Sequence, residues 1–228
     1  MIAGIAEAGF LFVLVVAVPA LSYRTSRRPE ILALPRLQLY LSSAMSQWLL
    51  AALGVVVVLA SSLTFAKLGF QVVSPASFFF WTALLSGVSL AALGLVVGLE
   101  QRGCLPPEPE LVRALIPETR REKFWAVLVI APTAAVCEEF LYRGFLLGEL
   151  SQRLPSVALA VALSSVVFGL AHTYQGLSGI ARAALLGALL SIPIIRLGTV
   201  FPSMAAHFLI DAVALVWLGP MMLKKRRQ

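Results

Sequence analysis

Long apolar stretches separated by short polar breaks dominate the chain. A helix that crosses a lipid bilayer needs about 20 consecutive apolar residues. Stretches of this kind occupy residues 3–22, 39–62, 77–99, 124–150, 155–173, 179–197 and 199–220. The pattern therefore predicts an all-α fold, a polytopic membrane helical bundle of about seven transmembrane helices.

The composition agrees with a membrane protein. Of the 228 residues, 60% are hydrophobic and only 13% are charged, and the mean hydropathy is +0.92. A soluble domain of this length is much more polar. The first apolar stretch resembles a signal peptide, but it carries Glu7 and no positively charged segment precedes it, so we expect a retained helix.

Positive charges predict the orientation of the bundle, because Lys and Arg accumulate on the cytoplasmic side of a membrane. The predicted spans place 14 of the 18 Lys and Arg residues on one side: Arg24, Arg27, Arg28, Arg36, Arg102, Arg113, Arg120, Arg121, Lys123, Arg182, Lys224, Lys225, Arg226 and Arg227. The opposite side receives Lys67, Arg153 and Arg196. We therefore expect the N-terminus outside and the C-terminus in the cytoplasm. Because topology explains the net charge of +7, we expect no nucleic-acid partner.

Ionisable side chains inside the predicted spans are candidates for function. A charged group at the centre of a membrane helix costs about 2.5–3.5 kcal/mol on insertion scales. Here such groups gather in the last four spans, as Glu138, Glu139, Arg143, His172, His207 and Asp211. Both histidines and the only aspartate of the chain are among them, which favours one polar site over scattered structural charges.

Helical spacing indicates which of these groups face one another. Residues four apart share a helix face, so Glu139 is expected to pair with Arg143, and His207 with Asp211. Glu138 points elsewhere and is the candidate base. Phe168, one turn before His172, is expected to form an apolar wall. Each feature alone also has a structural explanation. The Glu139–Arg143 pair can serve only to neutralise two charges, and each histidine can serve only to hydrogen-bond two helices.

The residue types suit activation of water. A carboxylate held in a low-dielectric site can take a proton from water and return it to a leaving amine. Histidine can hold that water or stabilise the oxyanion that forms. No G-x-S-x-G motif is present, and Cys137 points away from Glu138 without an evident base. The expected nucleophile is water.

Three motifs in the second half of the chain resemble those of a known family. The run E-E-F-L-Y-R-G at residues 138–144 resembles the E-E-x-x-x-R motif of the CPBP intramembrane proteases, which include the type II CAAX prenyl proteases and the bacterial Abi proteins. Phe168 and His172 match the F-x-x-x-H motif, and His207 and Asp211 match H-x-x-x-N/D. All three occur in the family's order.

The resemblance covers about residues 118–220. We therefore expect one integrated membrane domain with two parts. Residues 1–117 form N-terminal transmembrane helices and a cytoplasmic loop, and residues 118–228 form a CPBP-like catalytic core. We expect a multi-pass integral protein of a prokaryotic cell membrane. The resemblance also implies endopeptidase activity on a membrane-associated, in some members lipidated, peptide or protein. Membrane lipid is the other expected partner, and the pattern indicates no particular oligomeric state.

The family's roles fall on individual residues of this chain. The resemblance implies that Glu138 is the general base, that His172 positions the water, and that His207 with Asp211 stabilises the oxyanion. Glu139, Arg143 and Phe168 then support the site. Asp211 stands where Asn is usual, and an ionised aspartate cannot donate a hydrogen bond.

A metal is the open alternative for the same residues. Glu138, His172 and His207 would be the ligands of a catalytic zinc, with a position left for water. The chain lacks the H-E-x-x-H arrangement typical of zinc peptidases. A metal-free glutamate mechanism is slightly favoured, and no cofactor is then required.

Two other functions fit a membrane bundle of this kind. One is a catalytically idle scaffold or immunity protein of the same fold, against which the intact Glu138, His172 and His207 argue. The other is a proton-coupled transporter, but transporters usually carry inverted repeats with matched broken helices. No such repeat is apparent here.

If every span is a straight helix, the site residues lie at different depths in the membrane. If a span begins at Phe124, Glu138 lies about 21 Å from the cytoplasmic face, whereas His172 lies near that face. Proline breaks or kinks helices, so a break at Pro132 would resolve the conflict. We therefore expect a short interfacial helix near residues 117–123, residues 118–131 along the interface, and a site in the cytoplasmic half of the bilayer.

Overall fold

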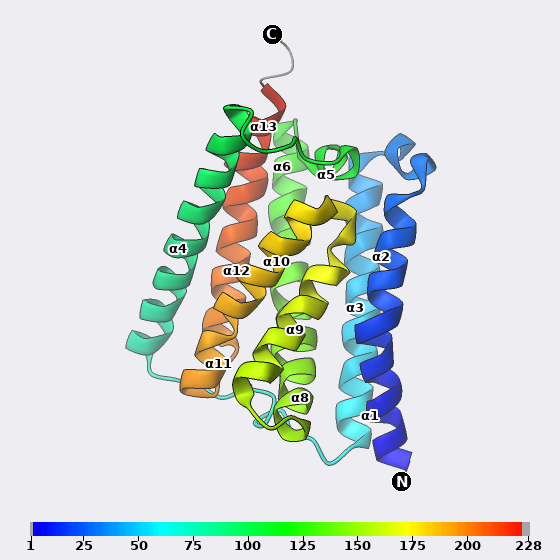
Figure 1. The fold of residues 1–228 in the computed structure, drawn as a ribbon, viewed down its shortest axis with the longest axis vertical. Helices are drawn as coiled ribbons and strands as arrows, with labels where there is room; N and C mark the ends of the chain where they lie inside the picture. The colour runs from blue at the N-terminus through cyan, green and yellow to red at the C-terminus, as the bar shows by residue number, and fades with distance from the viewer. Residues whose placement is uncertain (1, 225–228) are drawn as a thin grey trace.

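The computed structural model describes residues 2–224, and every regular element in that range is a helix (Figure 1). Six helices are long and apolar enough to cross a membrane: Gly4–Ser26, Arg36–Ala60, Pro75–Gln101, Arg120–Arg153, Thr173–Leu197 and Phe201–Leu223. A seventh apolar helix, Val157–Ala171, is shorter. The predicted multi-pass helical bundle is therefore confirmed, with six full-length spans in place of about seven.

The N-terminal elements form three long helices and one short turn. They are α1 (Ile2–Phe12), η1 (Val13–Ala17) and α2 (Val18–Ser26), which are continuous, then η2 (Pro29–Ala33), α3 (Arg36–Ala60) and α4 (Pro75–Gln101). The start of α4 follows from its sequence. Pro75 occupies the first turn, and the Ser74 hydroxyl accepts a hydrogen bond from the backbone N–H of Ser77.

The loop after α4 differs from the prediction. Its short helix is α5 (Glu110–Leu115), not residues 117–123. The reason is a capping box at Thr119: its side chain accepts from the N–H of Glu122, and the Glu122 carboxylate accepts from the N–H of Thr119. This cap starts the long helix at Arg120 itself.

One continuous helix carries the E-E-x-x-x-R motif across the bundle. Its segments are α6 (Arg120–Trp125), η3 (Ala126–Ile130), α7 (Ala131–Thr133), η4 (Ala134–Leu146) and α8 (Leu147–Arg153). The predicted break at Pro132, with residues 118–131 along the interface, is therefore wrong. The segments on either side, η3 and η4, are π-helical. Their wider turns relieve the clash and the lost hydrogen bond that proline causes in an α-helix.

The hairpin that carries His172 resolves the conflict of depth instead. It consists of α9 (Val157–Ala171), η5 (Thr173–Gln175) and α10 (Gly176–Leu190). With 15 residues, α9 is about 22 Å long, less than the hydrocarbon thickness of about 30 Å. In Figure 1 the turn between α9 and α10 stops short of the end of the bundle where α5 and α13 lie. His172 is thereby brought within 3.8 Å of Glu138, and its distance from the cytoplasmic face stays a prediction.

The last helices complete the bundle beside α4. They are α11 (Ile192–Leu197), α12 (Phe201–Val213), η6 (Ala214–Leu218) and α13 (Gly219–Lys224), and α12 packs against α4 and η4. The end of α2, the start of α6 and α13 lie together at one end of the bundle, opposite the start of α1 (Figure 1). This grouping is the one on which the predicted orientation depends, and the cytoplasmic identity of that end stays a prediction.

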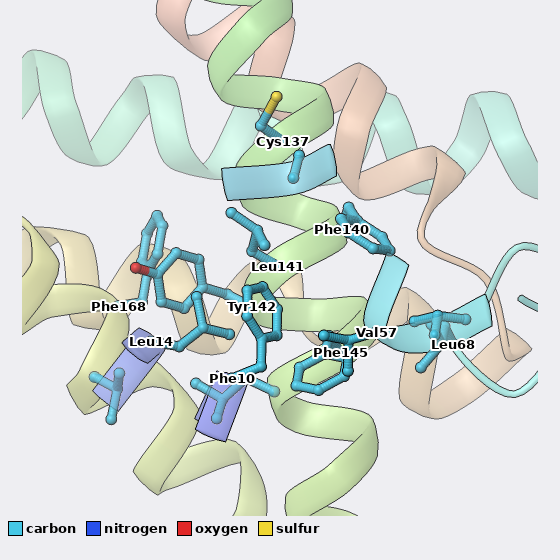
Figure 2. Close-up of a cluster of buried hydrophobic side chains, with 14 of the residues drawn as sticks. Phe10, Leu14, Val57, Leu68, Cys137, Phe140, Leu141, Tyr142, Phe145 and Phe168 are labelled. Carbon is cyan, nitrogen blue, oxygen red and sulfur yellow. The ribbon is translucent and has the colours of Figure 1, made fainter. Parts of the chain in front are cut away.

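The hydrophobic core lies where the first helices meet η4 (Figure 2). Phe10 of α1 packs edge-on against Phe145, with 4.9 Å between ring centroids. Cys137 is fully buried in the same cluster. Aromatic pairs of this kind add to the packing that fixes η4, and η4 carries the motif.

Helices α9 and α10 pack closely at Gly169. A Cβ at this position would lie 2.6 Å from the backbone oxygen of Ile180 in α10. We expect Gly169→Ala to lower the stability by about 1–3 kcal/mol, because α9 and α10 would have to separate. Gly94→Ala in α4 is the matched control, since its Cβ would meet nothing within 4 Å. Equal thermal unfolding of both variants in detergent would contradict this packing.

Candidate active site

Three parts of the fold bring the seven predicted residues together. Helix η4 supplies Glu138, Glu139 and Arg143, the end of α9 supplies Phe168 and His172, and α12 supplies His207 and Asp211. Direct contacts and a shared cavity connect them, as described below. The contacts between the three parts join residues far apart in the sequence, so helix packing, not local spacing, forms the site.

Glu139 is the central acceptor of the cluster. Its side chain is fully buried, and its Oε1 lies 3.0 Å from Nη1 of Arg143, which is also buried. The same oxygen accepts a hydrogen bond from Nδ1–H of His207 at 2.7 Å. The Arg143 contact is the one that the spacing predicts. The His207 contact is new, and it ties α12 to η4.

Arg143 connects this carboxylate to the second histidine through Phe168. The guanidinium carbon lies 4.1 Å from the centroid of the Phe168 ring, a cation–π distance. The Phe168 and His172 rings are 4.6 Å apart, and Nδ1–H of His172 donates to the backbone oxygen of Phe168 at 2.8 Å. Phe168 therefore fixes the orientation of His172 in addition to forming an apolar wall.

With both Nδ1 atoms engaged, the Nε2 atoms of the two histidines face Glu138. Glu138 Oε2 lies 3.8 Å from Nε2 of His172 and 3.9 Å from Nε2 of His207. These distances are too long for direct hydrogen bonds. One water molecule can bridge groups so separated. Asp211 lies beside the same place, with its Oδ2 3.7 Å from Nε2 of His207.

Two cavities meet at Glu138. One, of about 400 Å³, extends along α2, α3 and α5, and the other, of about 310 Å³, extends between α4, α10, α12 and α13. Glu138 and His172 line both cavities, whereas His207 and Asp211 line only the second. The candidate base is therefore reachable from two directions, while Glu139 is sealed in the interior.

Two further residues that the sequence did not single out line the cavities. Gln47 of α3 and Tyr174 of η5 line both of them beside Glu138. Oε1 of Gln47 is buried without a hydrogen-bond partner in the described structure. Gln47 is the only amide side chain within the apolar stretch 39–62, and this isolated polarity was the signal that could have identified it.

The side chains do not form a metal site as they stand. Within residues 2–224, no group of three or more His, Cys, Asp or Glu side chains could hold a metal ion. Zinc would need its nitrogen and oxygen ligands at about 2.0–2.2 Å. Glu138 Oε2 lies 3.8 and 3.9 Å from Nε2 of His172 and His207, a separation that one bridging water fits.

The two neighbouring glutamates should respond differently to loss of charge. Glu139→Gln leaves the buried Arg143 without its counter-charge, so we expect a loss of stability of about 3–5 kcal/mol. Glu138→Gln removes no contact within hydrogen-bond distance and should unfold near the wild-type temperature. Thermal unfolding of the purified proteins in detergent measures both. Equal destabilisation by the two substitutions would contradict the central role of Glu139.

The second half of the chain is similar to one known protein family. Residues 120–213 match a family model described as type II CAAX prenyl endopeptidase Rce1-like. No curated protein and no solved structure matched the chain. The matched segment contains all seven predicted site residues. This match supports the resemblance to the CPBP/CAAX proteases that the three motifs predict, and it covers residues 120–213 of the chain.

Proposed function

We propose that this protein is an intramembrane endopeptidase in which Glu138 activates water to hydrolyse a peptide bond of a membrane-associated, lipid-modified peptide or protein. The observation that carries the proposal is the position of the Glu138 carboxylate, which faces Nε2 of both histidines where two cavities meet. The substrate class follows from the apolar surroundings and from the prenyl endopeptidases after which the matching family is described.

In the first proposed step, a water between Glu138 and the histidines loses a proton to the Glu138 carboxylate. Its oxygen then bonds to the carbonyl carbon of the peptide. A base held near the attacked carbon contributes about 10²–10⁴-fold to rate. His172 is suited to orient the water, because its Nδ1–H bond to Phe168 directs Nε2 towards Glu138.

In the second step, the tetrahedral intermediate collapses. The carbon–nitrogen bond breaks, and the proton held by Glu138 passes to the leaving amine, which restores the carboxylate. A His207 protonated on both nitrogens would donate Nδ1–H to Glu139 and Nε2–H to the oxyanion. Asp211, 3.7 Å from Nε2, would then act by its charge on His207 and not as a hydrogen-bond donor.

Loss of the Glu138 carboxylate should abolish cleavage without loss of the fold. We expect Glu138→Gln to lower kcat for a farnesylated peptide by about 10²–10⁴-fold, measured by mass spectrometry of the products. Glu30→Gln, which changes an exposed glutamate, is the matched control and should cleave like the wild type. Equal cleavage by the Glu138 variant would contradict the assignment. No cleavage by any form, across lipidated and transmembrane peptides, would favour the idle scaffold.

The proposed steps use no metal, and chelation tests this. We expect the wild-type rate to stay unchanged after prolonged incubation with a strong zinc chelator, because water and Glu138 suffice. The rate before and after dialysis against the chelator measures the effect. A loss of cleavage that added zinc restores would contradict the metal-free mechanism and assign Glu138, His172 and His207 as ligands.

A further inference from the structure

A loop between α4 and α5 inserts a carboxylate into the second cavity. Glu108 is only 6% exposed, although Pro106, Pro107 and Glu110 around it are exposed or border solvent. It lines the cavity that also contains Glu138 and His172. A glutamate is among the residues least often buried in a loop, so its insertion requires a specific partner.

That partner is Arg182 of α10. Nη1 of Arg182 forms an ion pair with Oε1 of Glu108. Among the described residues that line this cavity, Arg182 is the only Lys or Arg. The second oxygen of Glu108 is buried without a hydrogen-bond partner in the described structure. The Glu108 carboxylate therefore neutralises the charge of Arg182, although one of its own oxygens has no hydrogen-bond partner in the described structure.

The loop lies against the turn that follows His172. A Cβ at Gly176 would lie 3.3 Å from Cγ of Pro109, so Pro109 packs directly on the start of α10. The N–H of Glu108 donates to the carboxylate of Glu100 at 3.1 Å. No helix includes Gly103–Pro109. A few contacts thus hold Glu108 in place, and they can be exchanged without unfolding a helix.

We propose that Arg182 binds a carboxylate of the peptide substrate, and that Glu108 occupies Arg182 until the substrate displaces it. This inference rests on the proposed peptidase function. Arginine is suited to such a site, because its planar guanidinium binds a carboxylate through two parallel hydrogen bonds. Glu138 and Asp211 line the same cavity and repel an anion, so Arg182 is the favourable position for it. In the free protein, the Glu108 carboxylate neutralises Arg182, whose side chain is 24% exposed, and so avoids an unpaired charge in the cavity.

The bound carboxylate has two possible sources with the same chemistry. It is either the C-terminus of the peptide or an acidic side chain near the cleaved bond. In both cases Arg182 fixes the separation between the carboxylate and the bond that reaches Glu138. Arg182 is then a specificity-determining residue that selects where the peptide is cut.

Binding can be measured without cleavage in the Glu138→Gln background. The probes are fluorescent farnesylated pentapeptides with a free C-terminal carboxylate, with an amidated C-terminus, or amidated with an internal glutamate. We expect the first or the third probe to bind at least about tenfold more tightly than the plain amide by fluorescence anisotropy. Arg182→Gln combined with Glu108→Gln should remove this difference and leave binding of the amide unchanged. Glu108→Gln alone should strengthen binding of the acidic probe several-fold.

The controls separate this proposal from the proposed function. Arg196→Gln removes an arginine from α11, outside both cavities, and should keep the preference. Thermal unfolding checks that each variant folds. Equal affinity for acidic and amide probes, no binding of any probe, or a preference that persists in the double variant would overturn the role of Arg182. Wild-type cleavage is assayed separately, so loss of the carboxylate preference with cleavage intact would leave the peptidase proposal standing.

Discussion

The buried Glu139 carboxylate is the interaction on which the site depends. Its Oε1 meets both Arg143 and His207, and Arg143 in turn lies over Phe168, whose backbone oxygen holds His172. Two histidines from two other helices are thus oriented from one carboxylate. A buried charge persists only where such partners compensate for its lost hydration. The cost of burying Glu139 is therefore linked to the positions of His172 and His207.

Glu138 and Glu139 have different surroundings, because consecutive side chains of a helix point in different directions. Glu139 points into the sealed interior, where it contacts Arg143 and His207. Glu138 points to the junction of two cavities, with its Oε2 near both Nε2 atoms but hydrogen-bonded to neither. A base that formed a direct ion pair would have little capacity to take a proton from water. The π-helical geometry of η4 covers this whole segment, and π-helical turns often occur at functional sites.

Local spacing and composition predicted the helical bundle, the Glu139–Arg143 pair and the set of residues that gather around Glu138. They could not predict the bond between Glu139 and His207, because no periodicity relates side chains on different helices. The position of His172 depends on the length of α9, which spacing does not determine. The helix continues through Pro132 because of π-helical turns on either side, which spacing does not reveal. Arg182 falls among the predicted cytoplasmic charges, and no local pattern in the sequence relates it to Glu108.

The most direct test of a glutamate-activated water is an experimental structure of the protein at a resolution that locates water, with anomalous diffraction recorded at the zinc edge. We expect a single oxygen within hydrogen-bond distance, about 2.7–3.0 Å, of Glu138 Oε2 and of one histidine Nε2, with no anomalous signal. An anomalous peak about 2.0–2.2 Å from Glu138, His172 and His207 would contradict the central claim. It would show that a metal, and not the carboxylate alone, activates the water.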